Sequence, residues 1–361
     1  MDKNKIAVIY GQDMGNMVQK LMEHANIAGE LRDGMTIGIK PNLVVAKKPD
    51  SGATTHTELI CGVIEYLQSH GKFDITIMEG SWVGDSTKRA FSVCGYHDIA
   101  AKYGVKLLDL KGDSFKSYGG INVCDAPMNV DYLINMPVLK GHCQTTMTCA
   151  LKNMKGCIPD REKRRFHTQG LHQPIAKLGT ILKPNLTIVD GICGDLDFEE
   201  GGNPIPMNRV LLGYDSVLID TCVCAMMGID LDEVPYIEMA ARMGAGSMDF
   251  TDDTLEELND ASGAGRMPVL SRRAKALGRH VEEKDACSAC YGSLIHALYR
   301  LDEMGRLGWL DDKVCIGQGF RGMENCGNLG VGNCTKGCKY SLGGCPPRAD
   351  QIMEFLQDHM G

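Results

Sequence analysis

An alternation of two residue patterns constrains the fold of this chain more than any other feature of its sequence. Short runs rich in β-branched residues predict strands at Lys5 to Tyr10, Met35 to Ile39 and Asp74 to Met78. Residues 16 to 31 and Thr57 to Ser69, which lie between these runs, have the apolar spacing of amphipathic helices. Strand, helix and strand in succession imply a parallel sheet with helices on its faces.

The alternation continues along the chain. Further strands are expected at Lys106 to Leu110, Asp131 to Asn135 and Leu186 to Val189, and a further helix at Val217 to Met227. We therefore predict an α/β fold in which a largely parallel, three-layer α/β/α sheet forms a ligand-binding domain over residues 1–245.

The composition changes after that domain. Residues 246–283 pass from acidic through Gly-rich to basic, which is typical of a linker. Residues 284–361 are rich in Gly and contain seven of the 16 cysteines. They are predicted to form a separate C-terminal Cys/Gly-rich iron-sulfur module.

Charge and hydropathy exclude several classes of function. The chain has 38 Lys and Arg against 46 Asp and Glu, so no basic excess indicates nucleic-acid binding. No apolar run approaches the roughly 18 residues that a membrane span needs, and no signal-peptide core follows the N-terminus. The protein is therefore expected to be cytoplasmic, without nucleic-acid or membrane partners. Neither a Walker A loop nor a GxGxxG sequence supports nucleotide binding.

Cytosolic thiols are kept reduced, so the surplus of cysteines favours metal or redox chemistry over disulfides. Cys287 and Cys290 form a CxxC ahead of a predicted helix, whose positive N-terminus favours thiolates. Cys334 lies in a Gly-Asn-Cys sequence, and Cys345 precedes two prolines that suit the first turn of a terminal helix. These four are the predicted ligands. Cys315, within an apolar run, is expected in the core, and Cys326 and Cys338 are reserve ligands.

Two metal centres compete for the four thiols. Zinc ribbons space their CxxC pairs by about 15 to 20 residues, whereas 43 residues separate Cys290 from Cys334. A [4Fe–4S] cluster accepts looser spacing and Gly-rich surroundings. We favour the [4Fe–4S] cluster and keep Zn as the alternative cofactor.

Polar residues follow several of the predicted strands, where α/β sheets bind ligands. They include Asn42, Lys140, His142 and Asp190, and His56 follows a further loop. Asn and Asp also form turns, which is the structural alternative for each loop. Lys140, His142, Lys152 and the run from Arg161 to Arg165 lie within 26 residues of an acidic protein, which indicates an anion site.

Lys152 and Asn153 are expected near the end of a helix that begins around Gln144. A solvated basic loop is the alternative to the anion site, and a helix N-cap is the alternative for Asp215. The candidate catalytic residues are His142, Lys140, Lys152 and His56. The candidate substrate-binding residues are Asn42, Asn153, Arg164, His167, Asp190 and Asp215.

Several of these segments resemble the motifs of domain-of-unknown-function family 362. The resemblance is carried by Lys40 to Asn42, Thr55 to Glu58, Asn135 to His142, Ala150 to Gly156, and continues to Asp220. It implies a family that often carries iron-sulfur modules in anaerobic bacteria and archaea. The usual module is a ferredoxin-like insertion with closely spaced cysteines, whereas this chain has a widely spaced C-terminal set.

The sequence thus favours a cytosolic iron-sulfur enzyme, an oxidoreductase or lyase, that acts on a small anionic molecule. The cluster would supply electrons or Lewis acidity, and His142 would act as general acid or base. Two other functions remain open. One is a non-catalytic electron-transfer or cluster-carrier protein that docks a redox partner protein, and the other is a regulator stabilised by zinc.

Overall fold

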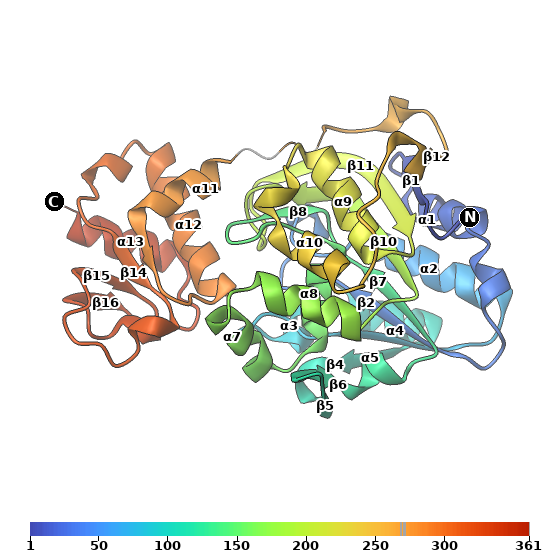
Figure 1. Cartoon of the computed structure of the whole chain (residues 1–361), viewed down its shortest axis with the longest axis horizontal. Coiled ribbons are helices and arrows are strands. Elements are labelled where there is room, and N and C mark those ends of the chain that lie inside the picture. The colour runs from blue at the N-terminus through green and yellow to red at the C-terminus, as the bar shows by residue number, and fades with distance from the viewer. Residues whose placement is uncertain (268, 270–271, 361) are drawn as a thin grey trace.

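The main sheet is assembled from the runs of β-branched residues identified above. The computed structural model describes residues 1–267, 269 and 272–360. Within them, the largest sheet has eight strands in the order β12-β1-β11-β10-β7-β2-β3-β4 (Figure 1). Their bounds are β1 (Ile6–Tyr10), β2 (Thr36–Pro41), β3 (Asp74–Glu79), β4 (Lys106–Asp109), β7 (Tyr132–Met136), β10 (Leu186–Asp195), β11 (Pro204–Gly213) and β12 (Leu255–Glu257).

The sheet is mixed but mostly parallel, which confirms the predicted α/β class. β11 runs antiparallel to both of its neighbours, β1 and β10. The other pairings in the sheet are parallel. β11 was not predicted, and its antiparallel direction follows from its hairpin connection to β10, since antiparallel strands need no crossover.

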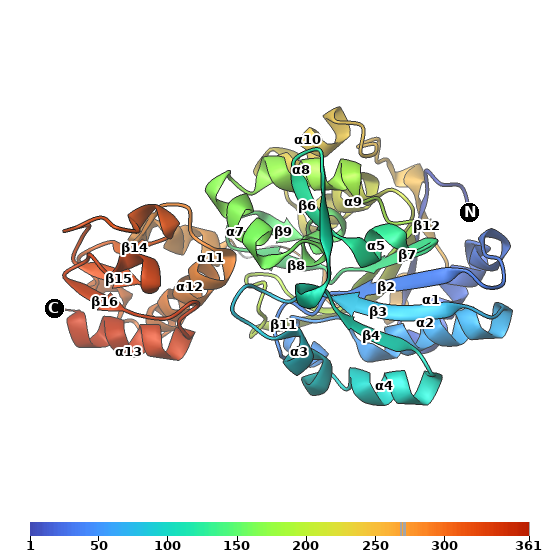
Figure 2. The same cartoon turned by 90° about the horizontal axis from the view of Figure 1, so that it is seen from below.

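Helices cover both faces of this sheet, because side chains of successive strand residues point to opposite faces. Ile6 and Val8 pack into one core, whereas Ala7 and Ile9 pack into the other. The helices against the second core are α1 (Met14–His24), α2 (Thr57–His70), α3 (Thr87–Val93) and α4 (Tyr96–Tyr103). Those against the first are α5 (Asp125–Asn129), α6 (Ala150–Asn153), α7 (Asp160–Thr168), α8 (His172–Ile181), α9 (Ser216–Met227) and α10 (Pro235–Arg242). Figure 2 shows the three layers.

The C-terminal unit has its own small sheet and core. Its parallel strands are β13 (Val281–Glu283), β14 (Val314–Ile316), β15 (Leu329–Val331) and β16 (Tyr340–Leu342). Its helices are α11 (Arg273–Leu277), α12 (Ser288–Glu303) and α13 (Ala349–His359). In both views this unit lies at the end of the molecule opposite the N-terminus, with α7 of the large domain beside it (Figures 1 and 2).

The segment 246–283, predicted as a linker, contributes to both units. β12 extends the large sheet by pairing with β1, while β13 pairs with β14 of the small sheet. Positions 268, 270 and 271 of this segment lie outside the described residues. The predicted start of the terminal helix is wrong: α13 begins at Ala349, after Pro346 and Pro347, with Arg348 as its N-cap.

Two hairpins complete the large domain: β5 (Phe115–Tyr118) pairs with β6 (Ile121–Cys124), and β8 (Lys140–His142) with β9 (Thr146–Thr148). The second hairpin corrects the prediction of a helix that starts around Gln144. Residues 143–145 form the turn between the two strands, and Thr146, which pairs with His142 at the start of β9, adopts φ 64°. The helix that carries Lys152 and Asn153 is the short α6, which begins only at Ala150.

Candidate functional site

A cavity lies at the carboxyl ends of β2 and β3, where the large domain meets the N-terminus of α12. It encloses about 590 Å³ of space, open solvent at its mouth included. Its wall is rich in cationic side chains, and the segment from Cys287 to Ala289 closes one side. We call it the cationic cavity. Its polar lining residues are Lys40, Asn42, Glu79, Ser81, Thr148, Lys152, Asn153, Lys155, Lys163, His167, Glu199 and Ser288.

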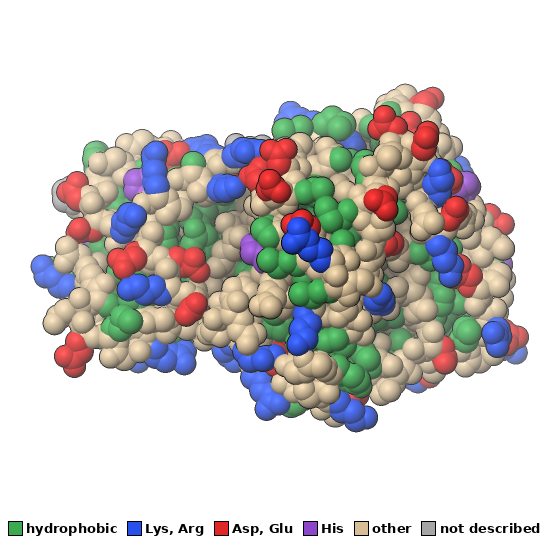
Figure 3. Space-filling model, viewed as in Figure 1, with side chains coloured by type: hydrophobic (Ala, Val, Ile, Leu, Met, Phe, Trp, Pro, Cys, Tyr) green, Lys and Arg blue, Asp and Glu red, His purple; other side chains and the backbone are tan. Residues whose placement is uncertain are grey.

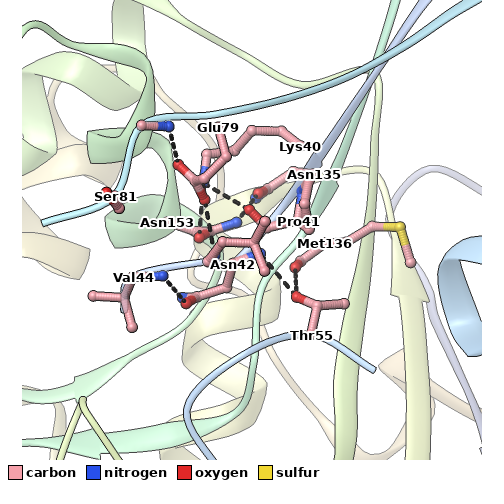
Figure 4. Close-up of polar contacts among 12 residues, drawn as sticks. Lys40, Pro41, Asn42, Val44, Thr55, Glu79, Ser81, Asn135, Met136 and Asn153 are labelled. Atoms are coloured by element: carbon pink, nitrogen blue, oxygen red, sulfur yellow. Dashed lines mark hydrogen bonds and ion pairs between the residues drawn. The ribbon is translucent and has the colours of Figure 1, made fainter. Parts of the chain in front are cut away.

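A buried ion pair forms the floor of the cationic cavity. Lys40, at the end of β2, donates to Glu79 Oε2 at 2.5 Å and to Asn153 Oδ1 at 3.0 Å. Asn153 in turn donates to Asn135 Oδ1 at 2.8 Å, which joins three strand ends to α6 (Figure 4). The opposite charges are close and their hydrogen bonds are made, so the pair is satisfied without a ligand.

A second buried carboxylate, Glu199, contacts two of the predicted catalytic residues, Lys152 and His142. Lys152 donates to Glu199 Oε1 at 2.5 Å, and His142 Nε2 lies 3.1 Å from Glu199 Oε2. Trp82 Nε1 donates to the same Oε2 at 3.1 Å. Burial alone would raise the pKa of Glu199, but the Lys152 ammonium, together with His142, outweighs it and holds that pKa well below its usual range.

The geometry around His142 fixes its protonation state. Its Nδ1 accepts hydrogen bonds from the backbone N–H groups of Gln144 and Thr145, so the ring proton lies on Nε2 and points to Glu199. Burial and the nearby Lys152 lower the pKa of His142 to about 4. His142 is therefore a neutral imidazole with both nitrogens engaged, and it does not line the cationic cavity.

Lys140 and His56 also bind groups within the protein. The Lys140 ammonium donates to Asn42 Oδ1, the Ala53 carbonyl and the Glu199 carbonyl, and burial lowers the pKa of Lys140 to about 7. His56 Nδ1 lies 2.8 Å from Asp190 Oδ2, which also accepts from the His56 backbone N–H. Burial opposes protonation of His56, but Asp190 outweighs it and raises the pKa.

The predicted acidic residues bind backbone groups. Asp215 accepts from the N–H groups of Val217 and Leu218 and is the N-cap of α9, as its structural alternative predicts. It lines a different cavity, together with Tyr214 and Ser216. Asp190 is fully buried and accepts from the Ile192 N–H in addition to His56.

Two groups on the wall of the cationic cavity are free to bind a ligand. Within the described part of the chain, the Lys155 ammonium makes no hydrogen bond or ion pair, and burial lowers its pKa to about 7. His167 Nδ1 is buried without a hydrogen-bond partner. Lys163 lies beside them and donates to the carbonyls of Gly80 and Ser81. Figure 3 shows further Lys and Arg side chains gathered near α7 on the lower side of the molecule.

Four cysteines surround a second cavity, in the C-terminal unit. They are Cys287, Cys290, Cys334 and Cys345, the four predicted ligands, and the space among them is about 380 Å³. Cys287 is the N-cap of α12, as predicted. No three His, Cys, Asp or Glu side chains of the described residues come close enough to hold one metal ion. The four thiols therefore surround a space and do not converge on a point. We call it the cysteine cavity.

The two cavities share a wall. Cys287 lines both of them, and the Cys287 and Lys155 side chains influence each other electrostatically. Arg164 of α7, a predicted substrate-binding residue, lines the cysteine cavity instead of the cationic one. Arg321 lines it as well and donates to Cys334 Sγ at 3.4 Å.

Sequence reasoning missed Glu199 and Trp82 as site residues, and it placed Lys155 in the anion site without singling it out. Glu199 lies in the loop between β10 and β11, far from Lys152 in the sequence, and the two residues meet only in the folded chain. Lys155 belongs to the cationic run in the sequence, but nothing in that run distinguishes it from the paired Lys152. Glu79 gave a usable signal, since it directly follows the predicted strand Asp74 to Met78, and β3 pairs with β2, which carries Lys40.

A known protein family matches most of the large domain. The model of a family described as domain of unknown function (DUF362) matches residues 37–225, which is more than half of the chain. The chain belongs to the DUF362 family. Its matched part runs from β2 to α9, so this DUF362 protein has both cavity-lining strand ends within the family domain.

Three known proteins are similar to this DUF362 chain, one in sequence and two in structure. The thylakoid-associated protein sll1697 of Synechocystis sp. is 23% identical over 229 residues, 59% of this chain and 70% of that protein. The lactate racemase apoprotein of Thermoanaerobacterium thermosaccharolyticum superposes with a TM-score of 0.40 and 11% identity, over 63% of this chain and 59% of that one. A Thermotoga maritima protein from a structural genomics consortium gives 0.35 and 12%, over 65% and 60%. The match spans less than two thirds of each solved structure.

Among the described helices of this DUF362 protein, none combines the length and apolar character required to cross a bilayer.

Proposed function

We propose that this protein is an iron-sulfur oxidoreductase that reduces a small anionic molecule. In this proposal Cys287, Cys290, Cys334 and Cys345 hold a [4Fe–4S] cluster in the cysteine cavity, and the anion binds next to it in the cationic cavity. The observation that carries the proposal is the shared wall: Cys287 lines both cavities.

The donor set supports a cluster. Each thiolate of a cubane binds a different iron, so the ligands surround a volume, and four thiols around one cavity match that requirement. Burial raises the pKa of Cys287 and Cys290 in the metal-free chain, whereas the positive end of α12 and a bound metal would each favour their anionic form. When bound, such a cluster supplies single electrons. Four cysteines also favour electron supply over Lewis acidity, since a Lewis-acid site leaves one iron without a protein thiolate.

The residues of the cationic cavity support an anionic substrate. Lys155 and His167 have unused polar atoms on the wall, whereas Lys40 and Lys152 are neutralised by Glu79 and Glu199. The paired lysines hold the walls in place, and the free groups bind a carboxylate or phosphate. Lys155 and Lys163 lie close enough for one to lower the pKa of the other, which a bound anion would relieve.

Metal content tests the first part of the proposal. Protein purified without oxygen should be brown and contain iron and acid-labile sulfide in a ratio of about four to four. An EPR signal should appear on reduction with dithionite. One equivalent of zinc with negligible iron would contradict the cluster and favour the zinc-stabilised alternative.

Ligand binding tests the second part. In a thermal-shift screen of small carboxylates and phosphate esters, a true ligand at a hundredfold excess over its Kd should stabilise the protein by about 2.7 kcal/mol. Lys155→Met should remove this stabilisation and keep the iron. The control is Lys177→Met, an exposed lysine on α8, which should bind as the wild type does. A protein that retains its cluster and binds none of these anions would be a carrier.

A further inference from the structure

The three C-terminal cysteines outside the cysteine cavity form a group of their own. Cys315, Cys326 and Cys338 pack together with Phe320, and none of the three lines the cysteine cavity. We propose that Cys326 and Cys338 are a redox-active dithiol pair, oxidised to an intramolecular disulfide by small-molecule or protein disulfides. This proposal does not depend on the proposed function.

The pair is defined by a direct contact between sulfur atoms. Cys326 Sγ lies 2.7 Å from Cys338 Sγ. Two thiolates on one tetrahedral zinc would lie about 3.8 Å apart, given Zn–S bonds of about 2.3 Å. The closer approach suits two sulfurs that bond to each other and does not suit two ligands of a common metal.

The backbone holds the two cysteines opposite each other. The Cys326 N–H donates to the Gly337 carbonyl, and the Lys339 N–H donates to the Gly327 carbonyl. The segments before β15 and before β16 therefore run side by side, and Cys326 on one segment lies opposite Cys338 on the other. No rearrangement of the chain is needed to bring the sulfurs together.

Cys315 completes the environment but is not a partner in the bond. It is buried in β14, and its thiol donates to the Cys326 carbonyl at 3.2 Å. Cys326 is partly exposed, whereas Cys338 is buried. An oxidant from solvent therefore reaches Cys326 first, and Cys338 is placed to resolve the product.

The reaction is a two-step thiol-disulfide exchange. The Cys326 thiolate attacks one sulfur of an external disulfide, which forms a mixed disulfide and expels one thiolate. Cys338 then attacks the Cys326 sulfur, which forms the internal bond and expels the second thiolate. The two thiol protons pass to the two leaving thiolates, so the protein loses two electrons and the external disulfide becomes two thiols.

The bond would close a loop around one wall of the cysteine cavity. The chain between Cys326 and Cys338 contains β15 and Cys334. A disulfide there would hold this segment in its folded position even when the cavity is empty. Oxidation would thus hold Cys334, the one cavity thiol within this loop, in its folded position.

Peptide mapping of the full-length protein tests the proposal. Protein prepared without oxygen is equilibrated in buffers of increasing oxidised-to-reduced glutathione ratio, quenched in acid, alkylated in denaturant and digested with trypsin. Cleavage after Lys313, Arg321, Lys336 and Lys339 places Cys315, Cys326 and Cys338 in the separate peptides 314–321, 322–336 and 337–339. We expect 322–336 linked to 337–339, lighter by two hydrogen atoms, in most molecules at the oxidising end and in few at the reducing end.

Matched variants identify the atoms involved. Because 322–336 also contains Cys334, Cys326→Ser should abolish the link, whereas Cys334→Ser and Cys315→Ser should retain it. A link that persists in Cys326→Ser would overturn the proposal, as would full alkylation of Cys326 and Cys338 at every glutathione ratio in the wild type. Loss of bound iron in Cys326→Ser with the fold retained would assign Cys326 to the metal site, and would also overturn it.

Discussion

At the scale of single residues, the cationic cavity is organised by two buried carboxylates. Glu79 neutralises Lys40, and Glu199 neutralises Lys152 while it orients His142. Removing one partner of such a pair leaves an uncompensated buried charge, which costs far more than the pair contributes. The unpaired Lys155 is therefore the lysine whose loss should affect ligand binding more than folding.

Gly156 allows the Lys40–Glu79 pair to form, and we predict that Gly156→Ala disrupts it. A Cβ at this position would clash with Glu79 Oε1 and would lie 2.7 Å from Lys40 Nζ. The carboxylate must move, so the free energy of unfolding should fall by about 2 to 4 kcal/mol. Urea denaturation measures this.

Gly112→Ala is the control for that prediction, because a Cβ there meets nothing within 4 Å. Equal stability of the Gly156 variant and the wild type would mean that the backbone around Gly156 adapts without cost.

At the scale of elements, the N-terminus of α12 connects the two cavities. Cys287 caps the helix, Cys290 lies in its first turn, and Ser288 donates to Gln144 of the loop between β8 and β9 at 2.8 Å. A change at this helix end therefore reaches both the four thiols and the large domain.

Two serine substitutions should distinguish a cysteine that binds metal from a cysteine that only packs in the core of this unit. Cys290→Ser should lose bound iron and unfold the C-terminal unit, because metal binding contributes to the folding of small Cys-rich domains. Cys315→Ser should keep its iron and lose only about 1 to 3 kcal/mol, the cost of a buried hydroxyl. Iron analysis and thermal denaturation of both variants measure this, and the reverse pattern would reassign the ligands.

At the scale of the whole molecule, the junction of the two units contains a buried acid without a hydrogen bond. Glu200 packs against Gly292 of α12, and neither of its carboxylate oxygens has a hydrogen-bond partner. His296 Nδ1 lies 3.9 Å from Glu200 Oε1, but burial lowers the pKa of His296 to about 4, so this ring is neutral at pH 7. The Lys47 ammonium donates to the Glu200 backbone carbonyl and opposes the effect of burial on the Glu200 pKa only in part. Burial raises the pKa of Glu200 from 4.5 to about 7.

The stability of the junction should therefore depend on pH through Glu200. Below pH 4.5 the carboxyl is protonated in both the folded and the unfolded chain, so its ionisation does not affect the free energy of unfolding. As the pH rises to 7, the unfolded chain releases the proton and the folded chain retains it, so stability is lost over this range. Glu200→Gln should be more stable than the wild type by about 1 to 2 kcal/mol at pH 8, and the gain should vanish near pH 4. Denaturation at both pH values measures the difference, and a gain independent of pH would exclude Glu200 ionisation as its cause.

Most strands of the large sheet, though not β11 or β12, and the grouping of the four thiols could be predicted from the sequence alone. Alternating patterns located strands such as Asp74–Glu79 and helices such as Thr57–His70 closely, because burial of one face imposes a local period on the residues. The local motifs around Cys287, Cys290, Cys334 and Cys345 identified the cysteines that line one cavity. Whether they bind a cluster stays a prediction.

Which charged residues face the cationic cavity with unpaired groups depends on the three-dimensional fold. Lys140, Lys152 and Lys155 look alike in the sequence. Lys140 and Lys152 bind groups from distant segments, namely Asn42, the Ala53 carbonyl and Glu199, whereas Lys155 has no such partner among the described residues. The contact between Cys326 and Cys338 likewise depends on how β15 and β16 pair. Local periodicity in the sequence indicates which side chains are buried. A buried charge, however, is neutralised by a group that the fold brings within a few ångströms. The sequence pattern does not contain the distances between such residues.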